Sequence, residues 1–143
     1  MIFDVLINKV DTLTDLMGTI WFELGNMPCR ALYYDLNGYA QSHFLAGKMS
    51  TIDLWLLDGL PKIALKKHKG ISISSYTTIY GQIDHYFNTH EFRVDCGEIS
   101  MDVSCDDKVD IAVGSYVAVK GTLQAFLPGV EGLSKEAIWF TYG

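Results

Sequence analysis

Hydrophobic and polar residues alternate along much of this chain, and residues 114–126 show the pattern most clearly. Val117 and Val119 fall on one side of an extended segment, whereas Tyr116 and Lys120 fall on the other. Successive side chains of a β-strand point to opposite faces of a sheet. The alternation therefore predicts a strand with one buried face.

Two of the predicted strands carry a glycine in their interior. Gly121 lies in the middle of residues 114–126, and Gly81 lies in the middle of residues 76–84. A glycine inside a strand is typical of a bulge or of a sharp bend. We therefore expect both strands to bend, as strands do at the corner of a small barrel.

Short segments with strand character recur along the whole chain, separated by clusters of Gly, Asn, Asp, Pro and Ser. The predicted strands are residues 2–10, 19–24, 30–36, 51–57, 76–84, 90–96, 99–105, 114–126 and 137–142. Residues 39–46 are predicted to form two helical turns, and the Asp-Gly and Pro of residues 58–61 are predicted to end the strand before them. Many short strands with turn signals between them indicate an all-β fold, either a barrel or a sandwich.

From residue 76 onward, the order of the predicted elements resembles that of an OB-fold. A strand broken by glycine is followed by a two-stranded hairpin, a strand of alternating valines with a Lys-Gly pair, and a closing strand at residues 137–142. The resemblance implies a five-stranded barrel over residues 71–143. Residues 1–70 are also β-rich and contain a hairpin of similar length, so they form either a second OB-like barrel or part of one larger β domain.

The bulk composition is that of an ordinary folded protein. The chain has 143 residues, of which 49% are hydrophobic, so it has enough apolar side chains for a core. No apolar run approaches the roughly 18–20 residues of a membrane helix, and no basic segment precedes the first apolar one. We therefore expect no membrane partner and no signal peptide. The three cysteines, Cys29, Cys96 and Cys105, are widely spaced, which predicts reduced thiols in a cytoplasmic protein.

The net charge of −6 is distributed unevenly. Residues 1–70 contain equal numbers of basic and acidic side chains, so the whole excess of acid lies in residues 71–143. An acidic surface repels nucleic acid and favours a basic protein partner, or it serves solubility alone.

The first functional hypothesis follows from the fold resemblance: a non-enzymatic module that binds single-stranded nucleic acid. OB-folds that bind single strands need outward aromatic or arginine side chains for stacking and cations along the backbone path. The outward positions of the hairpin at residues 90–105 carry carboxylates and no aromatic side chain, so we expect the site in residues 1–70. The expected site residues are Trp21, Arg30, Tyr33, Lys66, Lys67 and Lys69.

Trp21 and Tyr33 enter this site only if both side chains point outward. Ile20 and Phe22 are expected to point inward, which places Trp21 on the outer face. Leu32 and Tyr34 are also expected to point inward, which places Tyr33 on the outer face. The alternative is that both rings form a second apolar face and that the lysines lie in a solvated linker.

The second functional hypothesis is a protein-binding module, such as an inhibitor, an immunity-type protein or an accessory subunit. Here the acidic C-terminal half would face a basic partner. The expected contact residues are Asp95, Asp102, Asp106, Asp107 and Asp110. An unpaired edge strand in either half can also pair with a second copy of the chain, so a homodimer is a further expectation.

Catalytic and metal-binding patterns are weak in this sequence. The four histidines are scattered, and none has a metal-type spacing to a cysteine. The aspartates of residues 102–110 resemble a calcium loop only in charge. We therefore expect no enzyme activity, no metal and no cofactor.

Overall fold

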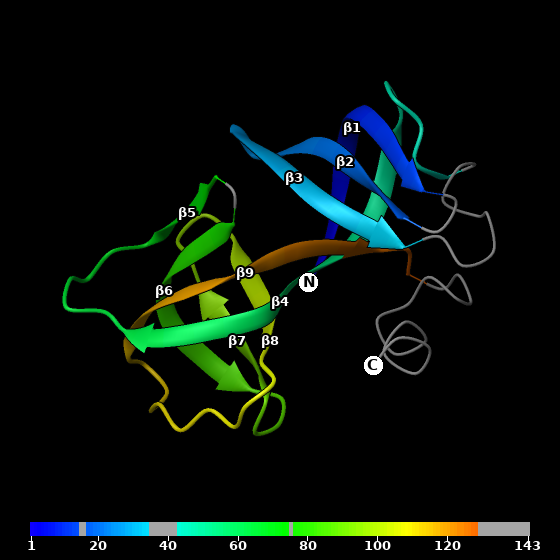
Figure 1. The fold of residues 1–143 in the computed structure, drawn as a ribbon. Helices are drawn as coiled ribbons and strands as arrows, with labels where there is room; N and C mark the ends of the chain where they lie inside the picture. The colour runs from blue at the N-terminus through cyan, green and yellow to red at the C-terminus, as the bar shows by residue number, and fades with distance from the viewer. Residues whose placement is uncertain (15–16, 35–42, 75, 129–143) are drawn as a thin grey trace. The chain divides into compact units, whose positions relative to one another are not determined.

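The computed structural model describes residues 1–14, 17–34, 43–74 and 76–128, and in these residues the protein is all-β, as predicted (Figure 1). The strands are β1 (Ile2–Thr14), β2 (Met17–Leu24), β3 (Met27–Tyr34), β4 (Met49–Ile63), β5 (Gly70–Ile73), β6 (Thr77–Tyr86), β7 (Glu91–Asp95), β8 (Ser100–Ser104) and β9 (Tyr116–Phe126). The predicted strand at residues 137–142 lies outside the described residues, as does most of the predicted helical segment at residues 39–46.

The alternation predicted for residues 114–126 is confirmed over residues 116–123 of β9 and is wrong beyond them, because Gln124, expected outward, is buried like the two residues after it. Val117 and Val119 are fully buried, whereas Lys120 is exposed and Tyr116 is half-buried. Gly121 is required by a close backbone approach, because a Cβ atom at this position would lie 2.6 Å from the carbonyl oxygen of Leu57.

Two stretches that were predicted to interrupt the sheet belong to strands. β4 does not end at residues 58–61 but continues to Ile63. Asp58 has a φ of 53°, and Gly59 is buried where a Cβ would lie 2.8 Å from the Val103 side chain, so the turn-type residues bend the strand instead of ending it. The stretch between the predicted strands at residues 51–57 and 76–84, where the two predicted halves meet, contains β5, which pairs with β6.

The nine strands are hydrogen-bonded in the order β1-β2-β3-β9-β4-β8-β7-β6-β5, with additional pairings of β1 with β4 and of β9 with β6. The chain divides into two compact units. Unit 1 contains Met1 and Trp55–Leu123, and unit 2 contains Ile2–Leu54 and Gln124–Gly143. These units group residues differently from the halves 1–70 and 71–143, whose division stays a prediction.

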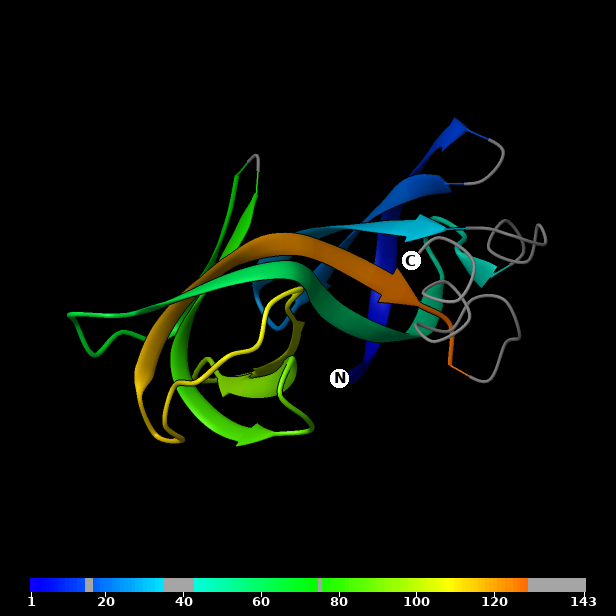
Figure 2. The same ribbon diagram turned by 60° about the horizontal axis from the view of Figure 1, so that its bottom comes forward.

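In unit 1, five strands form a closed ring. β6, β7 and β8 are an antiparallel meander, and β6 also pairs with β9 in antiparallel fashion. β8 pairs in parallel with β4 at Trp55 and Leu56, and β4 neighbours β9, which closes the ring. The curvature of the long strands is visible in Figure 2. The ring encloses fully buried side chains of Leu56, Ile79, Ile83, Phe92, Val94, Met101, Val103, Val117 and Val119.

Unit 2 has a related set of pairings. β1, β2 and β3 form an antiparallel meander. The first part of β4 pairs with β1 in antiparallel fashion, and the end of β9 pairs with β3 in parallel, with Leu32 beside Gln124. The buried core of this unit includes Val5, Ile7, Ile20, Phe22, Tyr33, Ile52 and Leu54.

β4 and β9 thus each contribute to both units, which predicts the behaviour of a nicked chain. Lys66 and Lys67 are exposed between β4 and β5, so brief trypsin treatment should cut there. The N-terminal fragment then holds the part of β4 that belongs to unit 1, and the C-terminal fragment holds the end of β9 that belongs to unit 2. We expect the two fragments to elute together in native gel filtration and to separate in urea. Separate elution without urea would contradict this pairing.

Candidate nucleic-acid interface

Tyr33, one of the two aromatic residues expected to stack bases, is buried, with 3% of its surface exposed. The expected orientation of β3 was wrong by one residue: Ala31 and Tyr33 point inward, and Leu32 is half-buried on the outer face. Gly18 lies opposite Tyr33 on β2, and a Cβ there would overlap the tyrosine hydroxyl oxygen. The glycine makes room for the ring, which also packs on Phe44 with centroids 5.2 Å apart.

Trp21 has the predicted orientation, half-buried on the outer face of β2 in unit 2. It lies in one cross-strand row between Lys9 of β1 and Arg30 of β3. The Lys9 ammonium is 4.7 Å from the centre of the indole ring. Lys9 also lies 3.7 Å from the carboxylate of Asp11, and exposed Glu23 follows Trp21 on the same face, so the charge around the ring is mixed.

The three lysines of the expected site belong to unit 1, whereas Trp21 and Arg30 belong to unit 2. Lys66 and Lys67 are exposed. Lys69 forms an ion pair with Asp95, with 2.8 Å between the ammonium nitrogen and a carboxylate oxygen. This hydrogen bond raises the pKa of Lys69 and lowers the pKa of Asp95, to which the Gly97 amide also donates. Lys69, expected to bind nucleic acid, and Asp95, expected to bind a basic protein, therefore neutralise each other's charge.

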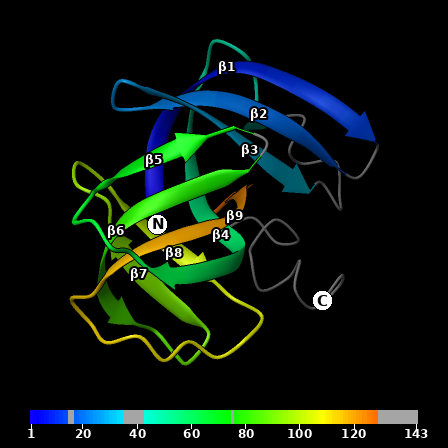
Figure 3. The ribbon, with the colours of Figure 1, turned by 60° about the vertical axis from the view of Figure 1, so that its left-hand side comes forward.

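A different aromatic surface lies on unit 1, where β5, β6 and β9 are neighbours (Figure 3). Tyr80 of β6 pairs with the small Ala118 of β9, and Tyr116 pairs with Gln82, so the two tyrosines are diagonal neighbours on the outer face. Diagonal positions on adjacent strands are about 7–8 Å apart, within reach of aromatic side chains. Both residues are half-buried, which leaves part of each ring accessible.

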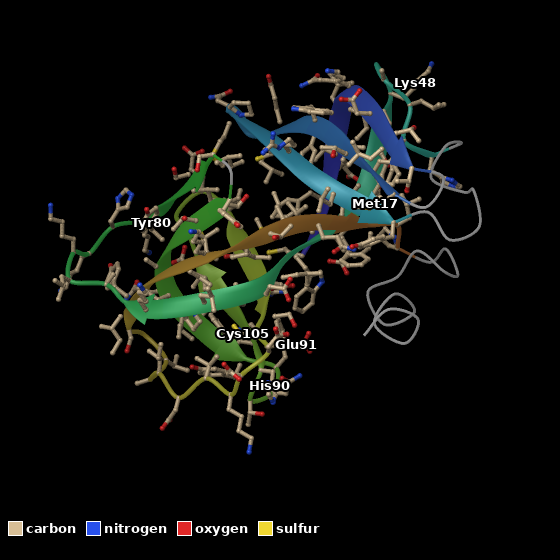
Figure 4. All side chains as sticks on the ribbon, in the orientation of Figure 1. Met17, Lys48, Tyr80, His90, Glu91 and Cys105 are labelled. Atoms are coloured by element: carbon tan, nitrogen blue, oxygen red, sulfur yellow. The ribbon has the colours of Figure 1, made fainter. Side chains whose placement is uncertain are left out.

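One cation and one imidazole ring lie directly on this surface. The Lys120 ammonium is 4.3 Å from the ring centre of Tyr76, which is 55% exposed, and the His68 ring is 4.9 Å from that of Tyr80 (Figure 4 labels Tyr80). We name this surface the tyrosine face and define it by Tyr76, Tyr80, Tyr116 and Lys120.

The basic segment, residues 62–69, runs beside the tyrosine face. The amide of Ala64 donates a 2.9 Å hydrogen bond to the carbonyl of Tyr116, and His68 contacts Tyr80. Lys66 and Lys67 lie between these two anchor points in the chain and are exposed. Lys66 and Lys67 thus lie in a loop whose two ends contact the tyrosine face, and not beside Trp21 or Tyr33 as expected.

Asp102 does not belong to an acidic docking surface, because it is buried, with 4% of its surface exposed. Arg93 donates to both of its carboxylate oxygens at 2.7 and 3.3 Å, and the N-terminal ammonium of Met1 lies 2.9 Å away. Burial raises the pKa of Asp102, but the hydrogen bonds from Arg93 and the ammonium outweigh it, so the pKa lies below its ordinary value. Asp106, Asp107 and Asp110 are exposed, as expected.

The cysteines are unpaired and buried, and burial raises the pKa of Cys29 to about 11 and those of Cys96 and Cys105 to about 12. Thiols of this kind are poor nucleophiles at neutral pH. In the described part of the chain, no group of three or more His, Cys, Asp or Glu side chains is arranged to hold a metal ion. A search of the same residues finds no helix with the length and apolar character needed to cross a membrane.

Neither the models of known protein families nor the curated protein sequences contain a match to this chain.

Proposed function

We propose that this protein is a non-enzymatic module that binds single-stranded nucleic acid on the tyrosine face of unit 1. The observation that carries the proposal is the diagonal pair Tyr80 and Tyr116 on a sheet face that also carries the Lys120 ammonium. Across the neighbouring outward positions of β6 and β9, from Thr78 to Gln82 and from Tyr116 to Lys120, there is no carboxylate. Aromatic side chains on a sheet can stack successive bases, and flanking cations can follow the phosphates.

The contacts already present on the tyrosine face do not prevent stacking. An exposed cation–π contact such as that of Lys120 with Tyr76 contributes about 0.5–1 kcal/mol. Stacking of one base on an aromatic side chain contributes about 1–3 kcal/mol. A base can therefore displace the ammonium, which then remains close enough to contact the adjoining phosphate.

The proposed fold of unit 1 is an OB-type barrel whose fifth strand comes first in the chain. Its supporting observation is the parallel pairing of β8 with β4, which is the pairing that the last strand of an OB-fold makes with the third. In this proposal β4 takes the place expected for residues 137–142. The proposed ligand surface lies on the strands that would be first and fourth in the barrel, β6 and β9.

The buried, unpaired thiols support the proposal that the protein acts in a reducing compartment such as the cytoplasm.

Anisotropy titration of fluorescein-labelled oligo-dT, at low and at moderate salt, tests the proposed function. We expect binding at low salt that weakens as salt is added, since phosphate contacts release counterions. Tyr80→Ala should weaken binding about five- to hundredfold, the equivalent of removing one stacked base. Replacing Lys66 and Lys67 by Gln should make the logarithm of affinity less steeply dependent on salt, by about 0.7 for each phosphate that is no longer neutralised.

Phe87→Ser is the matched control for Tyr80→Ala, because Phe87 is an exposed aromatic residue of the same unit outside the tyrosine face. It should bind oligo-dT like the unmodified protein. Absence of binding at low salt, or equal losses of affinity in the two variants, would contradict the proposed site.

A further inference from the structure

Phe87, which follows β6, is an accessible aromatic residue of unit 1 outside the tyrosine face, and its ring contacts three other side chains. It is 44% exposed. Its ring centre lies 6.0 Å from that of Trp55 and 4.9 Å from that of His85, which meets it edge to face. The guanidinium carbon of Arg93 lies 5.4 Å from the ring centre.

The groups that hold Phe87 are themselves fixed. Arg93 is anchored by its two hydrogen bonds to buried Asp102. The backbone amides of Phe87 and Asn88 both donate to the carbonyl of Glu91, and the Asn88 side chain donates to the Glu91 carboxylate at 2.8 Å. Because the ring is already ordered, a partner that packs on it loses little conformational entropy at this position.

Exposed carboxylates lie on a loop of unit 1 that is joined by backbone hydrogen bonds to the loop that carries Phe87. The amide of Cys105 donates to the carbonyl of His90, and the amide of Val109 donates to that of Thr89, each at 2.9 Å. Figure 4 shows His90, Glu91 and Cys105 together at one end of unit 1. These bonds tie the loop after β8 to the loop before β7. The exposed carboxylates carried by the two loops and the end of β6 are Asp84, Asp106, Asp107 and Asp110.

We propose that Phe87 and these carboxylates form a docking surface for a basic segment of a partner protein that places an apolar side chain on the Phe87 ring. Charge complementarity selects the occupant: the loop between β8 and β9, which the structure describes in full, carries exposed Asp106, Asp107 and Asp110 against one exposed lysine, Lys108, so a basic segment is attracted and phosphates are repelled. A central aromatic contact with a charged rim is the usual arrangement of a binding hot spot. The inference is independent of nucleic-acid binding, because it uses none of the residues of the tyrosine face.

The test uses the full chain and two labelled synthetic peptides, a lysine-rich peptide with a central leucine and the same peptide with serine in place of leucine. We expect the leucine peptide to bind more tightly in fluorescence anisotropy. Phe87→Ser should weaken binding of the leucine peptide about tenfold and leave the serine peptide unchanged. The double variant Asp106→Asn and Asp107→Asn should weaken both peptides and reduce the effect of salt.

Tyr80→Ala serves as the control and should bind both peptides like the unmodified protein. Equal affinities for the two peptides would overturn the proposal, since acidic side chains alone would then explain the binding. An undiminished affinity of Phe87→Ser for the leucine peptide would also overturn it. Circular dichroism of each variant distinguishes weaker docking on an intact fold from unfolding.

Discussion

Replacing Gly81 with alanine is expected to destabilise unit 1 by about 3 kcal/mol or more, the upper range for overpacking. A Cβ atom at this position would overlap the carbonyl oxygen of Asp95 and lie 2.7 Å from its carbonyl carbon. These are backbone atoms of the paired strand β7, so no side-chain rotation can relieve the clash. The strands must separate locally, which breaks ladder hydrogen bonds beside Tyr80. Urea unfolding followed by circular dichroism measures the decrease in stability.

Gly114→Ala is the control for this prediction. Gly114 has a φ of 88°, and no atom lies within 4 Å of the position of its Cβ. Replacing Gly114 with alanine introduces left-handed backbone strain without a steric clash. This strain costs about 1–2 kcal/mol. We expect Gly81→Ala to be clearly the less stable of the two variants. Equal stabilities would show that the backbone of β7 moves away at little cost.

The elements of the fold were predictable where one face of a strand is buried. In β9 the alternation of valines with Tyr116 and Lys120 records which side faces the core, and the structure confirms it. The expected break at Gly81 is wrong, because β6 runs through it from Thr77 to Tyr86; the glycine instead leaves room for the backbone of β7, since a Cβ would lie 2.7 Å from the Asp95 carbonyl carbon.

Predictions failed where a local signal was overridden by a distant partner. The Asp-Gly and Pro after Leu57 have the character of a turn, but pairing with other strands keeps this segment extended as part of β4. Tyr33 was assigned to the outer face because its neighbours are equally apolar. Only the paired Gly18, which lies on another strand, shows that the inner face has room for the tyrosine ring.

The candidate interface was predicted in part. The lysines of the basic segment are exposed, as a solvated basic run should be, and the two ends of their loop contact Tyr80 of β6 and Tyr116 of β9. Tyr116 and Lys120 were expected to point outward, yet no local pattern joins them to Tyr80. That contact depends on the register of β6 against β9, which pairs Tyr80 with Ala118.

Asp102→Asn is expected to destabilise the protein by about 2–4 kcal/mol at pH 7. Removing one partner of a buried ion pair costs about 3–5 kcal/mol, and the partial exposure of Arg93, whose side chain is 28% exposed, reduces this cost. The expected pH dependence follows from the lowered pKa of Asp102 in the folded state. A carboxylate whose pKa falls on folding stabilises the protein fully above its unfolded pKa, about 3.9, and this stabilisation is lost as the pH falls through the folded pKa.

The difference in unfolding free energy between the unmodified protein and Asp102→Asn should therefore stay constant from about pH 7 to pH 5 and shrink at lower pH. Urea unfolding at a series of pH values gives this difference directly. Asp106→Asn is the matched control, because Asp106 is exposed on the loop that follows β8 and its substitution should change stability by less than about 0.5 kcal/mol. If the difference for Asp102→Asn persisted unchanged well below pH 3, the destabilisation would stem from altered packing and not from the ionised carboxylate. A decrease with falling pH would instead identify the ionised carboxylate of Asp102, which pairs with Arg93 and with the Met1 ammonium, as the stabilising group.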